Sequence, residues 1–157
     1  MKAERTAADI MSRDVVSVSP DTTLREIANL LVEHGISGVP VVDRAGRVVG
    51  IVSEADLLNS EKRRVKLPRT ALFGVFPLPD DLVRETFDEG THLTAHDLMT
   101  RRVITLAADT AVRAVVSTML ERRVNRIPIV EDDKLVGIVT RNDALRAIQE
   151  EWNLSEG

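Results

Sequence analysis

The chain has 157 residues, a formal net charge of −4 and no cysteine. The lack of cysteine excludes disulfide bonds and thiolate metal sites, and the three histidines have no metal-ligand spacing. A negative net charge is unlike the basic surface of most nucleic-acid-binding proteins. No apolar run approaches the ~20 residues of a membrane span, and the first residues lack the apolar core of a secretion signal. We therefore expect a cytoplasmic protein without membrane contact.

Two segments, residues 8–58 and 95–150, repeat the same motifs in the same order. Equivalent residues of distinctive type recur 87 or 88 positions apart: Met11 with Met99, Asp21 with Asp109, Pro40 with Pro128, Gly50 with Gly137, and Asp56 with Asp143. Two copies at this period do not make a solenoid, which stacks shorter units in longer arrays. They predict a pair of small units with equivalent clefts where the units meet, and such clefts are ordinary sites for small ligands.

The first repeat predicts the order strand, helix, strand, strand, helix. Thr23 and Glu26 have the spacing of a capping box at the start of the first helix, and Gly35 suits the positive φ angle that ends it. Runs of β-branched residues predict strands on either side of a hairpin turn. The strands are expected at Val15–Val18, Val39–Val42 and Arg47–Val52, the apolar helix face at Leu24, Ile27, Ala28, Leu31 and Val32, and the second helix from Glu54.

The second repeat predicts the same order. Its strands are expected at Val103–Leu106, Ile127–Val130 and Leu135–Val139, its apolar helix face at Val112, Val115, Val116, Met119 and Leu120, and its last helix from Arg141. Trp152 is the only tryptophan, and it is expected just beyond that helix. Because aromatic side chains supply a large buried area, we expect Trp152 to anchor the core or an interface.

Residues 59–94 differ in composition from both repeats and form a linker or insert. This segment holds all three phenylalanines, Phe73, Phe76 and Phe87, and a short helix is expected at Asp80–Phe87. The phenylalanines indicate that the insert docks on the repeats or on a partner subunit. A lid over the cleft or an effector-binding surface is the alternative.

Each repeat ends in a strand followed by a hydroxyl residue and, three positions later, an aspartate. These pairs are Ser53 with Asp56 and Thr140 with Asp143. One interpretation is a capping box, in which hydroxyl and carboxylate satisfy the first N–H groups of a helix. The other is a ligand site, because a helix start suits a phosphate and a nearby carboxylate can accept both hydroxyls of a ribose.

The motifs together resemble a pair of CBS domains, also called a Bateman module. The resemblance rests on IMSRDVVSVSPDTT, GVPVVD and VVGIVSEADLL in the first repeat, and on LMTRRVITL, NRIPIVEDDKLVGIVT and RNDAL in the second. It implies an α+β fold in which two β-α-β-β-α repeats pack as a pseudo-twofold pair around one shared core. It also implies a homodimer that senses an adenosine-containing ligand in the clefts between the repeats and regulates another, unidentified protein.

The resemblance also assigns roles to residues of this chain. It implies that Asp56 and Asp143 bind ribose and that Ser53 and Thr140 bind phosphate. The base would lie against the first strand of each repeat and against the stretch around each repeated proline. The residues implied there are Ser17, Val39 and Pro40 in the first repeat, and Thr105, Arg126, Ile127 and Pro128 in the second. Core packing is the alternative for the apolar members of this set.

The two repeats differ in charge beside these motifs. The second repeat carries Arg126 and Arg141, whose guanidinium groups can bind phosphate oxygens, and the first has Gly38 and Glu54 at the matching positions. An acidic side chain repels a phosphate. The site around Thr140 and Asp143 is therefore expected to be the stronger nucleotide site.

The sequence leaves several functions to be weighed. The ligand is expected to be AMP, ADP or ATP, with S-adenosylmethionine or NAD as alternatives. A second hypothesis is a protein-interaction module that binds no nucleotide. A third is a nucleic-acid-binding protein that uses the basic run at residues 61–66. This third hypothesis is disfavoured because the aromatic side chains that stack on bases in single-strand binders are missing. Catalysis and a resident cofactor are not expected, because neither Ser53 nor Thr140 has a histidine partner to act as base.

Overall fold

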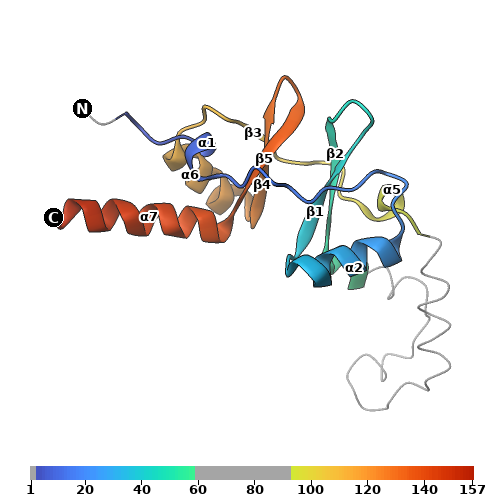
Figure 1. The fold of residues 1–157 in the computed structure, drawn as a ribbon. Coiled ribbons are helices and arrows are strands. Elements are labelled where there is room, and N and C mark those ends of the chain that lie inside the picture. Colours follow the sequence, from blue (N-terminus) through green and yellow to red (C-terminus); the bar gives the residue numbers. More distant parts are fainter. Residues whose placement is uncertain (1–2, 59–92) are drawn as a thin grey trace, which may run out of the picture. The chain divides into compact units, whose positions relative to one another are not determined.

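The computed structural model describes residues 3–58 and 93–157 (Figure 1). It has the expected α+β class, with short helices and small sheets. The helices are α1 (Ala7–Ile10), α2 (Leu24–His34), α5 (Ala95–Leu98), α6 (Val112–Arg122) and α7 (Arg141–Ser155), and residues 54–58 are also helical. The strands are β1 (Gly38–Val42), β2 (Val48–Ser53), β3 (Leu106–Ala107), β4 (Arg126–Glu131) and β5 (Lys134–Thr140).

The second repeat follows the predicted order, as β3, α6, β4, β5 and α7. The first strand of each repeat is shorter than predicted, and the predictions at Val15–Val18 and Val103–Leu106 are wrong in extent. In the first repeat only Val18 pairs, through a single parallel bridge to Val41. In the second, β3 has two residues and pairs in parallel with β4.

The repeated prolines explain why these first strands are short. Val18 donates its N–H to the Pro40 carbonyl at 3.0 Å and accepts from the Val42 N–H at 2.8 Å. The next bond of this parallel ladder would run from the N–H of residue 40 to the Val16 carbonyl, and proline has no N–H to donate. Pro128 holds the equivalent position opposite β3. The ladder therefore stops at the residues that precede Val18 and Leu106.

The two hairpins confirm the predicted turns. β1 and β2 form one two-stranded sheet, and β3, β4 and β5 form a second sheet in that order. Asp132 and Asp133, between β4 and β5, have φ angles of 50° and 64°. Two successive residues with positive φ make the turn type whose twist matches that of a hairpin.

Helix α2 is capped as predicted, by Thr23 and Glu26 at its start and by Gly35, with φ 60°, at its end. The predicted apolar face is too wide. Ile27 and Leu31 are buried, whereas Val32 is 83% exposed. On α6, Leu120 is 72% exposed by the same geometry, because it follows the buried Met119 by one residue, which is a rotation of about 100° around the helix.

The described residues divide into two compact units that do not coincide with the two repeats. The C-terminal unit consists of Met1–Val15, Arg44–Val48 and Val103–Gly157, and the N-terminal unit consists of Val16–Asp43 and Val49–Arg102. Each unit is thus completed by the segment that begins the other repeat. The expected limits mark the two repeats, 8–58 and 95–150, and the insert between them, 59–94. The compact units cross these limits.

We call the segment that contains α1 and the segment that contains α5 the exchanged segments. Backbone hydrogen bonds hold them in equivalent ways. In the C-terminal unit, Ser12 and Ile138 exchange N–H···O bonds of 2.9 and 3.0 Å. In the N-terminal unit, Thr100 and Ile51 exchange bonds of 2.9 and 3.1 Å. The segment around α1 therefore extends the sheet edge at β5, and the segment after α5 does the same at β2.

The buried apolar side chains form one cluster in each unit. The cluster of the C-terminal unit includes Ala7 of α1 together with residues of α6, β4, β5 and α7. The cluster of the N-terminal unit includes Ala95 of α5 together with residues of α2, β1 and β2. The predicted pseudo-twofold pairing around one shared core stays a prediction.

A methionine from each exchanged segment lies directly against a glycine of the central hairpin. A Cβ atom at Gly50 would stand 2.8 and 2.9 Å from Cγ and Cβ of Met99 and would also meet its Sδ. Met11 lies in the same way against Gly137. These distances are below any normal carbon–carbon contact, and they involve Met99 atoms close to the backbone. Only glycine therefore fits at either position.

We expect Gly50→Ala to lower the free energy of unfolding by about 1–3 kcal/mol, because the new methyl group overpacks the contact with Met99. Met99→Ala opens the space that the methyl needs. Chemical denaturation of Gly50→Ala, Met99→Ala and the double variant measures the coupling, and the double variant should be more stable than the sum of the two losses predicts.

The pair Gly50→Ala with Met11→Ala is the matched control for that cycle. Met11 contacts Gly137 in the C-terminal unit, so the two losses should add. Additivity in the Met99 cycle as well would show that the methionine contact does not select glycine at position 50.

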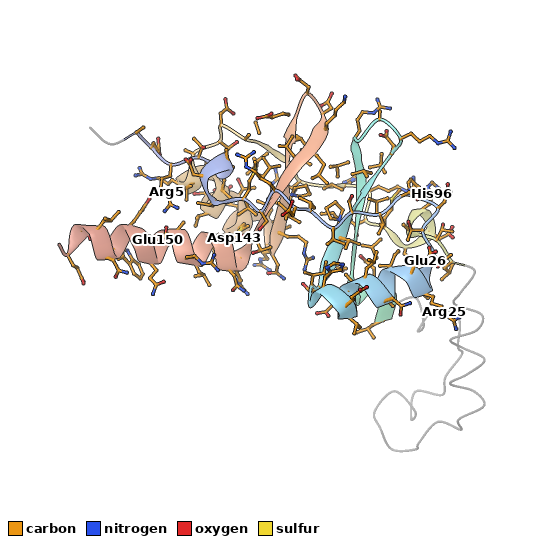
Figure 2. All side chains as sticks on the ribbon, viewed as in Figure 1. Arg5, Arg25, Glu26, His96, Asp143 and Glu150 are labelled. Atoms are coloured by element: carbon orange, nitrogen blue, oxygen red, sulfur yellow. The ribbon has the colours of Figure 1, made fainter. Side chains whose placement is uncertain are left out.

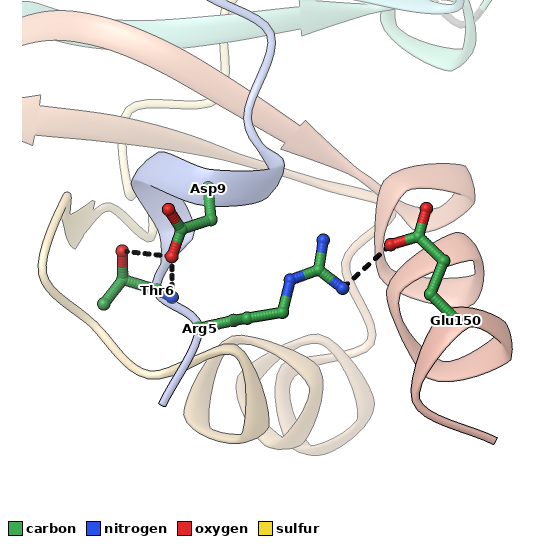
Figure 3. Close-up of polar contacts among 4 residues, drawn as sticks. All are labelled: Arg5, Thr6, Asp9 and Glu150. Atoms are coloured by element: carbon green, nitrogen blue, oxygen red, sulfur yellow. Dashed lines mark hydrogen bonds and ion pairs between the residues drawn. The ribbon is translucent and has the colours of Figure 1, made fainter. Parts of the chain in front are cut away.

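The exchanged N-terminal segment also makes polar contacts, both within itself and with α7 (Figure 3). The Asp9 carboxylate accepts from the backbone N–H of Thr6 at 2.7 Å and from its hydroxyl at 3.2 Å. Arg5 forms an ion pair of 2.9 Å with Glu150 on α7. The Thr6 backbone bond, with smaller help from the Thr6 hydroxyl and the Arg5 charge, lowers the pKa of Asp9.

This lowered pKa gives the segment a pH dependence. The Asp9 contribution to stability is present above the ordinary aspartate pKa and is lost as the pH falls through the lower pKa of the folded state. Thermal unfolding from about pH 6 to about pH 2.5 should therefore show Asp9→Asn less stable than the native chain at the upper end, with the difference shrinking at the lower end. Asp14→Asn, an exposed carboxylate in the same segment, is the control. A constant difference for Asp9→Asn would refute the role of ionisation.

Several expectations have other outcomes. Trp152 lies inside α7 and is 67% exposed, so the prediction that it follows the helix is wrong, and so is the core alternative. The insert, including the helix expected at residues 80–87, lies almost wholly outside the described residues. Among the described helices, none is long and apolar enough to cross a membrane. The cytoplasmic location stays a prediction.

Candidate functional site

The predicted site residues fall into two sets, and each set lies within a single unit. The set of the second repeat lies in the C-terminal unit, where β3, β4 and β5 are neighbours and α7 follows β5 directly. It consists of Thr105, Arg126, Ile127, Pro128, Thr140, Arg141 and Asp143. The set of the first repeat lies in the N-terminal unit and consists of Ser17, Val39, Pro40, Ser53 and Asp56.

In the C-terminal unit, strand register brings these positions to one end of the sheet. Arg126, at the start of β4, is the direct partner of Thr140, at the end of β5. Leu106 pairs with Ile129, so Thr105 comes immediately before the paired part of β3. The Arg141 N–H donates to the Asn125 carbonyl at 2.9 Å, which fixes the start of α7 beside the start of β4.

The hydroxyl and carboxylate of the second repeat form a capping box. Asp143 lies at the start of α7, where the chain leaves β5 (Figure 2). Its Oδ2 accepts from the Thr140 N–H at 2.8 Å and from the Thr140 hydroxyl at 2.9 Å. Both bonds use Oδ2, which leaves Oδ1 outside the capping interaction. Asp143 is half-buried, and its two bonds to Thr140 set the orientation of the carboxylate.

The first repeat has the same geometry. Oδ2 of Asp56 accepts from the Ser53 N–H at 2.8 Å and from the Ser53 hydroxyl at 3.1 Å. The Glu54 N–H donates to the Ser37 carbonyl at 2.9 Å, as Arg141 does to Asn125. The carbonyls of Ser37 and Asn125 were not among the predicted site residues, and only their equivalent positions in the two repeats could have pointed to them.

The capping interpretation of the motif is thus confirmed at both sites, and the motif alone does not identify a ligand site. Three other hydroxyl–carboxylate pairs in the described chain cap helices in the same way: Thr6 with Asp9, Thr23 with Glu26, and Thr94 with Asp97. Ser53 and Thr140 differ from these three because each ends a strand that passes directly into a helix. The carboxylates that bond to them, those of Asp56 and Asp143, therefore lie at the end of a sheet.

The apolar members of both sets are core residues. Ile127 and Val39 are completely buried, and Pro128 and Pro40 are also fully buried. The side chains of Ile127 and Val39 belong to the two apolar clusters, so what these buried residues offer to a ligand is backbone. Since Pro128 donates no N–H to the Ile104 carbonyl, that carbonyl is left outside the β3–β4 ladder, and Pro40 has the same effect on Val16.

The charged members differ in position. Arg126 is half-buried and lies across from Thr140. Arg141 is exposed and is separated from Asp143 by two residues of α7, a rotation of about 200°, so the two leave different faces of the helix. Of the two arginines, Arg126 is thus the better placed beside Thr140. A role for Arg141 in phosphate binding stays a prediction.

The described residues include no group of three or more histidine, cysteine, aspartate or glutamate side chains that could hold a metal ion. The two sets of site residues contain hydrogen-bonding groups. Each set offers a hydroxyl, a carboxylate oxygen and backbone carbonyls, and the C-terminal unit adds a guanidinium group.

Comparison with known proteins assigns the family. The family model described as "CBS domain" matches residues 7–62 and 95–150. The chain belongs to the CBS domain family. An uncharacterized protein of Methanocaldococcus jannaschii is 33% identical over 150 residues, which covers 89% of each chain. Seven further relatives are longer, and the chain spans between 22% and 63% of their lengths.

Two solved CBS structures contain adenosine derivatives. CBSX2 in complex with AMP has a TM-score of 0.71 and 27% identity, covering 92% of this chain and 96% of CBSX2. The CBS domain pair of protein MJ0100, in complex with 5′-methylthioadenosine and S-adenosyl-L-methionine, has a TM-score of 0.70 and 25% identity. It covers 95% of this chain and 99% of that one. The predicted family and fold are therefore confirmed.

Removing the Thr140 cap should destabilise α7. We expect Thr140→Ala to lower the free energy of unfolding by about 1 kcal/mol, because the hydroxyl no longer bonds the Asp143 carboxylate. Thr118→Ala makes the same chemical change inside α6, where alanine is the better helix former, and should be neutral or slightly stabilising. Urea unfolding of both variants measures the difference. Equal stabilities would exclude a capping role for Thr140.

Proposed function

We propose that this CBS pair is a non-catalytic regulatory module that binds an adenosine-containing ligand, with AMP, ADP or ATP preferred. The stronger site is the set around Thr140 and Asp143. The observation that carries the proposal is the arrangement at Asp143, where capping uses Oδ2 and leaves Oδ1 to accept the hydroxyls of a ribose. The ligands of CBSX2 and of MJ0100 support it, because AMP, methylthioadenosine and S-adenosylmethionine share the adenosine group.

Backbone carbonyls favour adenine over guanine at this site. The Ile104 carbonyl, which receives no N–H from Pro128, is an acceptor for the exocyclic amino group of adenine. Guanine presents a carbonyl oxygen at the equivalent position and would place two acceptors against each other. Guanine nucleotides should therefore bind more weakly than adenine nucleotides.

The charge beside each set tunes the preferred tail of the ligand. Arg126, opposite Thr140, favours a phosphate, and the Asn142 N–H in the first turn of α7 is a further donor for an anion. In the N-terminal unit Gly38 and Glu54 replace the two arginines, so a neutral or cationic tail suits that set better. S-adenosylmethionine, whose sulfonium group is cationic, is accordingly assigned to the first repeat, whereas NAD carries a diphosphate and is not. The position of any ligand relative to the other unit stays a prediction.

Regulation follows from binding alone. A ligand that binds one conformation more tightly than another shifts the population toward it by the difference in binding free energy. The regulated target is then a separate protein that recognises one conformation. No bond is made or broken in this scheme.

Asp143→Glu separates the ligand role from the capping role. Glutamate is a good residue at this capping position, as Glu26 shows in the box with Thr23, so the variant should keep nearly native stability. Its carboxylate is displaced by one methylene group, so AMP affinity measured by calorimetry should fall by about tenfold or more. Asp56→Glu is the matched control and should leave the tighter site unchanged.

Unchanged AMP affinity in Asp143→Glu would refute the assignment of the stronger site. A second experiment compares AMP with adenosine on the native chain and on Arg126→Gln. The native chain should prefer AMP, and the variant should lose that preference while still binding adenosine.

One observation favours a second candidate, a protein-interaction module that binds no nucleotide. Three other hydroxyl–carboxylate pairs in the described chain are plain helix caps, and the same explanation suffices for Ser53 and Thr140. A thermal-shift panel of AMP, ADP, ATP, S-adenosylmethionine and NAD distinguishes the two. Stabilisation by none of them would favour the interaction module.

A further inference from the structure

Two methionines at equivalent positions hold the exchanged segments against strands β5 and β2. Met11 packs on the apolar cluster of the C-terminal unit, and Met99 packs on that of the N-terminal unit. The Cγ atom of each methionine lies 2.8 Å from the point where a Cβ atom would stand on the facing glycine, Gly137 or Gly50, and its Sδ meets the same point. The thioether sulfur of each exchanged segment is thus packed against the backbone of a strand.

The three methionines that the structure describes differ in exposure. Met11 and Met99 are half-buried, so part of each side chain is open to solvent. Met119, on α6, is 7% exposed and belongs to the buried core of the C-terminal unit. A dissolved oxidant must reach a thioether in order to convert it to the sulfoxide. Met11 and Met99 are therefore the accessible thioethers of the described chain, and Met119 is a protected one.

We propose that Met11 and Met99 are sites of oxidation by peroxide, and that oxidation of each one loosens its exchanged segment from the neighbouring strand. A lone pair of the sulfur attacks one oxygen of hydrogen peroxide, so that an S–O bond forms as the O–O bond breaks. The sulfur gives up two electrons, and the leaving hydroxide takes the proton of the transferred oxygen and becomes water. The product is methionine sulfoxide, which methionine sulfoxide reductases convert back.

The contacts with glycine leave no room for the added oxygen on that side of the sulfur. A single methyl group does not fit between either methionine and its glycine. The sulfoxide is larger than the thioether, and it is polar. Beside an apolar cluster its oxygen loses hydrogen bonds to water unless the side chain moves outward. Oxidation should therefore displace the methionine and weaken the paired backbone bonds next to it.

Other attachments confine this loosening to one end of each segment. Ala7 and Ala8 donate backbone N–H bonds of 2.7 and 2.9 Å to the stretch before α6. Ala95 and His96 donate bonds of 2.8 and 2.9 Å to the stretch before α2. These bonds lie away from the methionines, at the start of α1 and of α5. The expected effect is thus a local opening at the edges of β5 and β2, and the rest of each unit stays folded.

Peroxide treatment of the full chain, followed by mass spectrometry of its peptides, tests the accessibility. Met11 and Met99 should each gain one oxygen at a rate about tenfold or more above that of Met119, because the buried sulfur is out of reach. The same treatment in urea is the control. Unfolding exposes all three thioethers and should make their rates equal.

Hydrogen exchange before and after peroxide treatment tests the loosening. The N–H groups of Ser12 and Ile138 form the paired bonds of 2.9 and 3.0 Å that follow Met11 in the chain. Their exchange should become about tenfold or more faster after oxidation, since exchange reports local opening. Met11→Leu removes the thioether and nearly keeps the volume. In this variant the two amides should no longer respond to peroxide.

Each leucine variant is the control for the other. In Met11→Leu, the amides of Thr100 and Ile51 should still respond, because Met99 is unchanged. In Met99→Leu the pattern should reverse. Met119→Leu should keep both responses. Exchange measured before peroxide treatment shows that each variant is folded.

Ligand binding gives a second readout, which rests on the proposed function. Since β5 ends at Thr140, oxidation should also raise the dissociation constant for AMP. Faster exchange after peroxide in a chain that binds no AMP would count against the nucleotide site alone. Normal AMP binding in a chain that shows no response to peroxide would count against the oxidation sites alone.

Three outcomes would overturn the proposal. The first is an equal oxidation rate for Met119 and the two half-buried methionines in the folded native chain. The second is oxidation of Met11 and Met99 in the native chain without faster exchange. The third is a Met11→Leu variant in which the amides of Ser12 and Ile138 still respond to peroxide.

Discussion

Each compact unit of this protein depends on a short segment that the sequence places at the start of the other repeat. Residues around α1 complete the sheet and the apolar cluster of the C-terminal unit, and residues around α5 do the same for the N-terminal unit. The methionines Met11 and Met99 fill the space above Gly137 and Gly50, where no side chain fits. Neither repeat therefore has a complete core of its own. Because the exchanged segments also form paired bonds with β5 and β2, they hold the strands that end in Thr140 and Ser53.

A second constraint, the lack of an N–H group in proline, connects the fold to the candidate site. Pro40 and Pro128 end the parallel ladder early and leave the carbonyls of Val16 and Ile104 outside it. Strand β4 still continues and is paired with β5 from Arg126 to Glu131. The same residue type thus shortens one strand and leaves a backbone acceptor outside the ladder. In both units this acceptor lies on the stretch that the family resemblance assigned to the base.

The two sets of site residues share a scaffold and differ in charge. Both carboxylates cap a helix through Oδ2, and both helix starts are tied to the strand before the repeated proline. Arg126 is present in only one set, opposite Thr140. Arg141 is exposed and leaves a different face of α7 from Asp143, and its role in phosphate binding stays a prediction. The charge difference between the repeats therefore has two parts, one at the candidate ligand site and one on an exposed helix face.

The sequence by itself determined the repeat, the α+β class, the family and the helix caps at Thr23, Ser53 and Thr140. These features depend on residues close together in the chain or on a period that is visible without coordinates. Only the tertiary structure decided that the start of each repeat belongs to the unit of the other repeat, because that depends on contacts between residues far apart in the chain, such as Ser12 with Ile138 and Ile51 with Thr100. It also decided that Val32, Leu120 and Trp152 are exposed, since periodicity fixes which residues share a helix face but not how wide the covered part of that face is.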